Sequence, residues 1–218
     1  MVGPLNPSVT ELTTAATDAA MGVLALLLLL DLRRLRVRSA WQRNVWTEVF
    51  GLLVAGSVLG AITHGFELSA AVRAQIWPPL YLSLGLAVAL FVVGAVGDLM
   101  GEAAGRRLFP WAVAAGVGFF AASQWLGGAF LIFVIYEGAA MLLALAIFLR
   151  VAMRGEAWAW WTASGIALTL GAATVQAASL RMTLVVPFDH NGLFHLLQMA
   201  ATVLIAAGVR AGLRAPQG

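Results

Sequence analysis

The sequence contains no cysteine and no lysine, and these two absences exclude several classes of protein. Without cysteine the chain forms no disulfide, thiolate metal site or iron–sulfur cluster, so any metal ion must be held by histidine, carboxylate or water. All thirteen basic residues are arginine, which excludes a retinal Schiff base, a pyridoxal phosphate linkage and a P-loop lysine. A seven-helix retinal photoreceptor is thereby ruled out.

Charged residues are also scarce, and long apolar runs take their place. Only 11% of the 218 residues are charged and 61% are hydrophobic, whereas a soluble domain is about 25% charged. A transmembrane helix needs about 20 apolar residues, and the sequence offers seven such segments. We therefore predict an all-α polytopic bundle that forms a single transmembrane domain over residues 1–218. The predicted helices cover residues 9–30, 45–63, 76–99, 108–126, 129–149, 157–180 and 193–213, with Gly127 and Gly128 as the turn after the fourth.

The distribution of arginine predicts the orientation of these helices. Arginine-rich loops stay on the cytoplasmic side of a membrane, and only Arg73 and Arg181 lie on the opposite predicted side. The sequence therefore predicts an N-terminus outside and a C-terminus inside, in a multi-pass protein of the plasma or bacterial inner membrane. Because nearly all arginines flank predicted helices, we expect the lipid bilayer, and no nucleic acid, as their partner. Eleven arginines lie on the predicted inner side: Arg33, Arg34, Arg36, Arg38, Arg43, Arg106, Arg107, Arg150, Arg154, Arg210 and Arg214.

Eight tryptophans fall mostly near the ends of the predicted helices. Tryptophan is enriched where a membrane meets water, because its ring is apolar and its N–H is polar. We interpret the eight tryptophans as an aromatic belt rather than as a ligand site.

The polar residues inside the predicted helices gather toward the outer side. Ionisable groups are costly in a bilayer and usually face the bundle interior or a cavity. Residues three or four apart share one face of a helix, and three helices carry such a polar stripe. The sequence therefore predicts one outward-facing polar cavity. The three stripes are Glu11, Thr14 and Asp18; Ser57, Gly60 and His64; and His195, Gln198 and Thr202.

All three histidines, His64, His190 and His195, are predicted at this outer side. Neutral imidazole is the commonest metal ligand, and three nitrogens with one water form the open tetrahedral site of catalytic zinc. A structural role is the alternative for each, since His64 can cap its helix and His190 can lie in a solvated loop. Asp18 needs a partner, for which Arg181, His195, a metal ion or a proton are the candidates.

Two short motifs resemble a known superfamily. Residues 61–66 (AITHGF) end the second predicted helix, and residues 189–198 (DHNGLFHLLQ) open the seventh. This arrangement resembles the superfamily of alkaline ceramidases, progestin and adiponectin receptors and hemolysin III-like proteins. The resemblance implies a zinc ion held by His64, His190 and His195, a nearby serine and aspartate, and hydrolysis of a lipid amide.

The sequence departs from that superfamily at three points. The two histidines of the last helix are four residues apart in the superfamily, whereas His190 and His195 are five apart, about 140° off register. His190 therefore joins the site only from the turn before the helix. Gly60 stands where the superfamily has serine, so Ser57 is the nearest substitute. The aspartate of the third helix is missing too, and Asp18, Glu67 or Asp189 would replace it.

The predicted function is a zinc-dependent membrane hydrolase that acts on a lipid amide or ester, with Asp18 or Glu67 shuttling the proton. A different class of protein fits the same pattern, namely a non-catalytic seven-helix sensor that binds a metal ion or an amphiphilic small molecule. A haem or quinone redox protein with His64 and His195 as axial ligands, and a proton-coupled transporter using Asp18 and Glu137, are further alternatives. The sequence does not give the oligomeric state.

Overall fold

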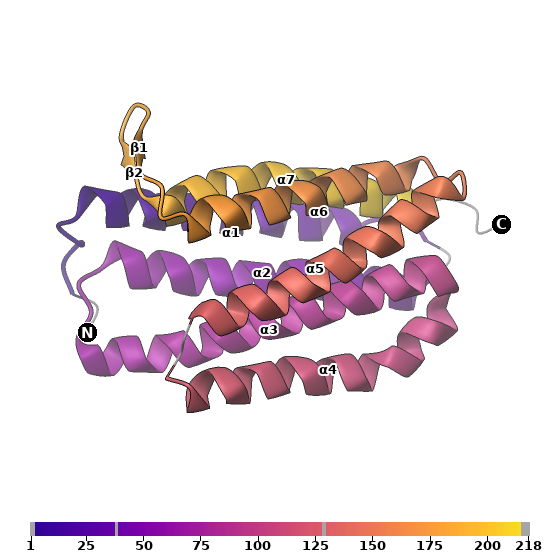
Figure 1. The fold of residues 1–218 in the computed structure, drawn as a ribbon, viewed down its shortest axis with the longest axis horizontal. Coiled ribbons are helices and arrows are strands. Elements are labelled where there is room, and N and C mark those ends of the chain that lie inside the picture. The colour runs from indigo at the N-terminus through magenta and orange to yellow at the C-terminus, as the bar shows by residue number, and fades with distance from the viewer. Residues whose placement is uncertain (1–2, 38, 128–129, 215–218) are drawn as a thin grey trace.

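The protein is a bundle of α-helices with one short β-hairpin (Figure 1). A computed structural model describes residues 3–37, 39–127 and 130–214. The two strands, β1 (Met182–Thr183) and β2 (Pro187–Phe188), pair antiparallel between the last two helices. Seven helices occur in the described residues: α1 Val9–Arg33, α2 Ala40–Gly65, α3 Ala70–Met100, α4 Glu102–Trp125, α5 Phe130–Met153, α6 Trp158–Ala177 and α7 His190–Arg214.

Each apolar segment predicted from the sequence forms a helix, and most helices extend beyond the apolar run. Helices α2 and α3 begin at Ala40 and Ala70 rather than at Val45 and Ile76. The hydroxyls of Ser39 and Ser69 cap these two helices by accepting hydrogen bonds from backbone N–H groups in the first turn. The apolar run marks the hydrophobic segment, whereas the capping residue sets where the helix begins. Gly127 follows α4 with a φ of +71°, as expected for a turn, while Gly128 lies outside the described residues.

Six helices form a closed ring, and α4 lies outside it. In the order α1, α2, α3, α5, α6 and α7, each helix packs against the next, and α7 packs against α1. Helix α4 packs mainly on α3, at the edge of the bundle (Figure 1). The chain therefore places α1 between α2 and α7, which the sequence order alone does not require.

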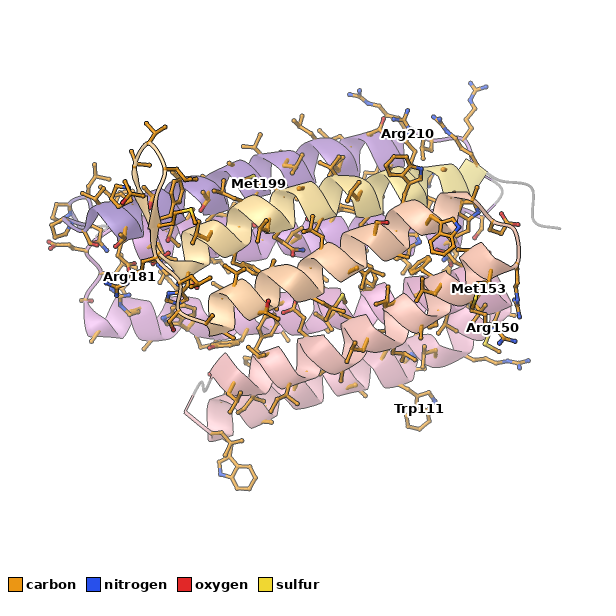
Figure 2. All side chains as sticks on the ribbon, turned by 45° about the horizontal axis from the view of Figure 1, so that its top comes forward. Trp111, Arg150, Met153, Arg181, Met199 and Arg210 are labelled. Atoms are coloured by element: carbon orange, nitrogen blue, oxygen red, sulfur yellow. The ribbon has the colours of Figure 1, made fainter. Side chains whose placement is uncertain are left out.

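Within the described residues, five helices are long and apolar enough to cross a membrane, namely α1, α2, α3, α5 and α7. The two ends of the bundle differ in charge (Figure 2). Arg150 and Arg210 mark one end, called here the arginine end, whereas Arg181 lies beside the β-hairpin at the opposite end, called the hairpin end. This segregation of charge agrees with the loop arginines of the sequence.

The apolar core takes buried side chains from all seven helices, and its largest residue lies between α2, α3 and α5. Trp46 of α2 is fully buried, with its ring edge-on to Phe91 at a centroid distance of 5.0 Å and 6.4 Å from the ring of Phe148. Gly94 of α3 makes room for this indole, because a β-carbon there would lie 2.7 Å from the ring. Trp46 is thus a core residue and not part of an aromatic belt, whereas Trp111 and Trp125 are exposed on α4.

A polar contact joins two loops at the arginine end. The Ser39 hydroxyl donates a hydrogen bond to Glu102 Oε2 at 2.6 Å, and Arg106 forms an ion pair with Glu102 at 2.6 Å. Both contacts lower the pKa of the Glu102 carboxyl below its usual value, the Ser39 bond most strongly. Arg106 also lies over the Trp41 ring at 4.9 Å. The start of α2 is thereby attached to the start of α4.

Candidate functional site at the hairpin end

Polar side chains from α1, α2 and α7 meet inside the hairpin end of the bundle. Thr14, Thr17 and Asp18 of α1 are buried, as are Ser57 of α2 and Thr202 of α7. Since α1 packs against both α2 and α7, its polar stripe faces the stripes of these two helices. The structure confirms that the three predicted stripes share one end of the bundle.

His64 is paired with Glu11. The Nδ1 atom of His64 lies 2.8 Å from Glu11 Oε2, and the two side chains are 18% and 36% exposed. The backbone carbonyl of His64 accepts a hydrogen bond from the Asn6 side chain at 3.1 Å, and the Trp77 ring lies edge-on to the imidazole. Glu11, not Glu67, is therefore the carboxylate beside His64.

His195 is held between two residues of α1. Its Nδ1 lies 3.1 Å from the Thr17 hydroxyl, and its Nε2 lies 3.4 Å from Asp18 Oδ1. The single proton of the Thr17 hydroxyl points to the carbonyls of Thr14 and Thr13, at 2.9 and 3.1 Å. The Thr17 oxygen is therefore placed to accept from Nδ1–H of His195, which leaves Nε2 facing Asp18.

Asp18 reaches α2 because residue 60 is glycine. A β-carbon at Gly60 would lie 2.7 Å from Asp18 Oδ2 and 2.9 Å from Oδ1, closer than packed atoms allow. Gly60 and His64 are four residues apart and share one face of α2. The carboxylate of Asp18 thus lies between the α2 face that carries His64 and the imidazole of His195. Of the two side chains that the sequence offers as partners of Asp18, Arg181 and His195, the structure places His195 beside it.

Asp189 fixes the start of α7 against α1. Its Oδ1 accepts hydrogen bonds from the Thr14 hydroxyl at 2.8 Å and from the backbone N–H of Gly192 at 2.9 Å, and the side chain is 8% exposed. The second bond satisfies a free N–H of the first helical turn. Asn191 accepts a further bond from Gln176 of α6 at 2.9 Å. These bonds set the position of the whole first turn of α7.

The remaining predicted site residues lie apart from these pairs. His190 is the first residue of α7, and its side chain forms no hydrogen bond or ion pair within the described part of the chain. Glu67 is exposed, and it is its backbone N–H that bonds to the Pro4 carbonyl. Ser57 is buried opposite Gly22. Glu137 lies on α5, and its carboxyl group likewise forms no hydrogen bond or ion pair among the described residues.

Within the described residues, no group of three or more His, Asp or Glu side chains is placed so that it could hold a metal ion. The three histidines predicted as ligands do not form such a group. Instead the structure shows two separate pairs, Glu11 with His64 and Asp18 with His195. Metal binding stays a prediction.

The sequence placed Glu11 on the correct stripe but gave no partner for it. Thr17 was missed altogether, although it follows Thr14 by three residues and so shares that face of α1. The partner of Thr17, His195, lies on another helix, so only the packing of α1 against α7 shows this contact. The pattern of threonines at residues 13, 14 and 17 was the available signal.

The comparison with protein families gave one match, to a family described as a family of unknown function (DUF6962), over residues 13–214. Because the match covers nearly the whole chain, the chain belongs to this family. No curated protein and no solved structure matches the chain.

The bond between Thr14 and Asp189 is expected to couple α1 to α7. Replacing Thr14 by Val leaves a buried carboxylate oxygen with one donor fewer, and Asp189→Ala leaves the Thr14 hydroxyl and the Gly192 N–H without an acceptor. We expect each change to lower the free energy of unfolding by about 1–3 kcal/mol, measured by circular dichroism during denaturation in mixed micelles.

The double variant decides whether the two residues act together. Its loss should be smaller than the sum of the single losses by at least about 0.5 kcal/mol. Thr174→Val is the control, because Thr174 is exposed on α6 and bonds within its own helix. Strictly additive losses would contradict a direct coupling.

Proposed function

We propose that this member of the family is a seven-span membrane protein with its N-terminus outside and its C-terminus in the cytoplasm. Five helices have the length and hydropathy of membrane spans, and α4 and α6 run alongside them in the same bundle (Figure 1). Arginines on the loops between α1 and α2, α3 and α4, and α5 and α6, and on the last turn of α7, all fall at the arginine end. The positive-inside rule then supports a cytoplasmic arginine end and an outer hairpin end.

The natural absence of cysteine makes this topology directly testable. Val185 is 96% exposed at the tip of the β-hairpin, and Arg36 is exposed in the loop between α1 and α2. In intact cells we expect a membrane-impermeant maleimide to label Val185→Cys and not Arg36→Cys. Permeabilised cells should show labelling of both. Labelling of Arg36→Cys alone in intact cells would reverse the proposed orientation.

We propose that the hairpin end binds a divalent metal ion through His64, His195 and Asp18, and that zinc is the preferred ion. One observation carries this proposal: both histidines are anchored through Nδ1, His64 to Glu11 and His195 to Thr17. Histidines that bind metals usually bond in this way through the nitrogen that does not touch the metal, which orients the ring. Each imidazole is therefore left with Nε2 for a ligand.

The chemistry of these donors fits zinc, although they do not converge in the structure described. Two imidazole nitrogens and one carboxylate are the protein ligands of many catalytic zinc sites, in which water takes the fourth position. Asp18 Oδ1 and His195 Nε2 lie 3.4 Å apart. A metal ion held by these two atoms would compete with protons for them, so metal affinity should rise with pH.

Zinc analysis of single variants tests this ligand set against the three-histidine set. Purified protein should contain about one zinc per chain by mass spectrometry of the metal, and His64→Ala, His195→Ala and Asp18→Asn should each lower the content at least tenfold. His190→Ala should retain zinc, since His190 contacts none of the pairs. Loss of zinc in His190→Ala would instead favour the three histidines as the ligand set. Wild-type protein that contains no zinc after reconstitution would contradict metal binding altogether.

Hydrolysis of a lipid amide or ester is the second candidate function, and the position of Asp18 favours it. In the superfamily that the sequence resembles, a serine stands at the place of Gly60, and here the carboxylate of Asp18 fills the space that such a side chain would take. Bound zinc would activate water by lowering its pKa to about 7. Glu11, next to His64 and partly exposed, is then the carboxylate positioned to accept a proton.

Two glutamates at the hairpin end allow a matched test of hydrolysis. If the protein is a hydrolase, zinc-loaded wild type should turn over at least one long-chain amide or ester, and Glu11→Gln should lower the rate by about 10²–10⁴. Glu67→Gln should leave it unchanged, because that side chain is exposed and unpaired with the histidines. Zinc binding without turnover across the panel would favour the non-catalytic sensor.

A further inference from the structure

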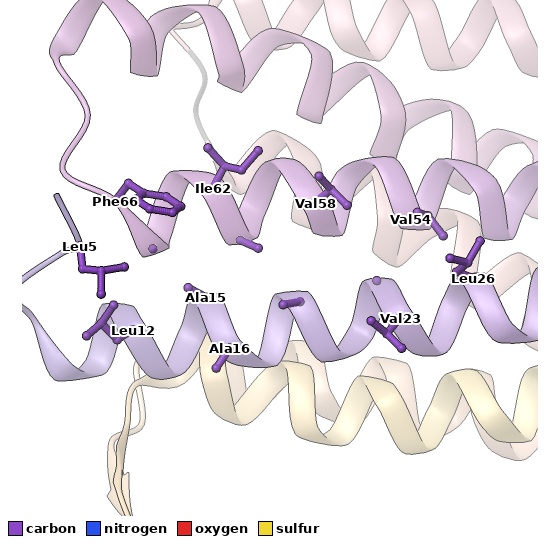
Figure 3. A pocket seen from close by; sticks show the side chains of 14 residues that line it. Leu5, Leu12, Ala15, Ala16, Val23, Leu26, Val54, Val58, Ile62 and Phe66 are labelled. Atoms are coloured by element: carbon purple, nitrogen blue, oxygen red, sulfur yellow. The ribbon is translucent and has the colours of Figure 1, made fainter. Parts of the chain in front are cut away.

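A groove runs along the outside of the bundle between α1 and α2 (Figure 3). Its volume is about 530 Å³, and all the residues that line it are apolar. Leu5 and Phe66 close the groove at the hairpin end, while Leu26 and Val54 lie at its other end. None of the residues of the histidine pairs lines it, so it is a feature separate from the candidate metal site.

Small residues create this groove. Where α1 and α2 meet, a β-carbon at Gly22 would lie 3.4 Å from that of Ser57, and one at Gly65 would lie 3.4 Å from that of Ala15. On the groove side of this contact α1 presents Ala16 and Ala19, which are too short to fill the space between the helices. Six of the residues that line the groove are alanine or glycine, and their short side chains leave it open between the two helices.

The dimensions of the groove select its occupant. From Leu12 to Leu26 the α1 wall is about 21 Å long at 1.5 Å per residue, somewhat more than the roughly 15 Å depth of one leaflet of a 30 Å hydrocarbon core. The lining of the groove is wholly apolar, so it offers no hydrogen-bonding side chain to a polar occupant and only van der Waals contacts to a carbon chain.

We propose that this groove holds one acyl chain of a phospholipid from the leaflet at the hairpin end. The headgroup lies at the outer surface near Leu5 and Phe66, and the chain runs along α1 and α2 toward Leu26 and Val54. Packing against both helix walls gives this chain more contacts than a chain on a convex helix surface has. The proposal rests on the proposed membrane insertion but not on metal binding or hydrolysis.

Adjacent alanines provide the test. Ala19 lines the groove, whereas Ala20 is also exposed on α1 but does not line it. The wild type, Ala19→Trp and Ala20→Trp are reconstituted in phosphatidylcholine vesicles that contain a phosphatidylcholine with a diazirine near the end of one acyl chain. After illumination, peptide mass spectrometry locates the lipid adducts. Val58→Trp fills the groove from the α2 wall and serves as a second variant.

In the wild type we expect adducts concentrated on residues 23–26 and 54–58, at least fivefold above the exposed apolar residues Leu131, Ile135 and Leu142 of α5. Ala19→Trp and Val58→Trp should lower groove labelling at least fivefold, and Ala20→Trp should leave it unchanged. Labelling spread evenly over α1, α2 and α5, or unchanged groove labelling in both filling variants, would overturn the proposal. Maleimide labelling of Val185→Cys in the same vesicles shows separately whether the chain is inserted.

Discussion

The contact of Asp18 with Gly60 is the constraint on which the rest of the hairpin end depends. The carboxylate lies so close to α2 that residue 60 has no room for a side chain, since even a β-carbon would approach to 2.7 Å. This close approach brings α1 near enough for Glu11 to reach His64 one turn further along α2. On the opposite side of α1 the same carboxylate reaches His195 of α7. One aspartate therefore determines how three helices are spaced.

Burial explains why these polar groups occur in pairs. An isolated charge inside a bilayer costs about 2.5–3.5 kcal/mol on insertion scales, and an unpartnered buried hydroxyl or amide also costs free energy. Asp189 receives two donors, His195 contacts two side chains, and Thr17 bonds to its own helix and to His195. Such a network specifies one arrangement of α1 against α7 rather than simply adding stability, because a shift of either helix leaves several groups unpaired at once.

The sequence predicted the helices well because hydropathy is a local property. It predicted contacts between helices poorly because these join residues that are far apart in the chain. All seven apolar segments form helices, and the polar stripes do meet at one end. Trp46 was placed in an aromatic belt because it lies near a predicted helix end, but the extension of α2 to Ala40 puts it deeper, in the core. Glu11 with His64 and Thr17 with His195 join residues 53 and 178 positions apart, so no spacing rule within one helix indicates them. The residues of α4 likewise do not predict that this helix lies outside the ring.

The five-residue spacing of His190 and His195 acquires a physical meaning from the cap of α7. Asp189 bonds to the N–H of Gly192, so the helix already begins at His190. With the helical turn set there, His190 points about 140° away from His195, and the side of α7 that faces α1 carries only His195. Asp18 of α1, and not His190, contacts Nε2 of His195. A carboxylate from a neighbouring helix thus lies beside the imidazole that His190 does not reach, which supports the proposed donor set of two histidines and one aspartate over three histidines.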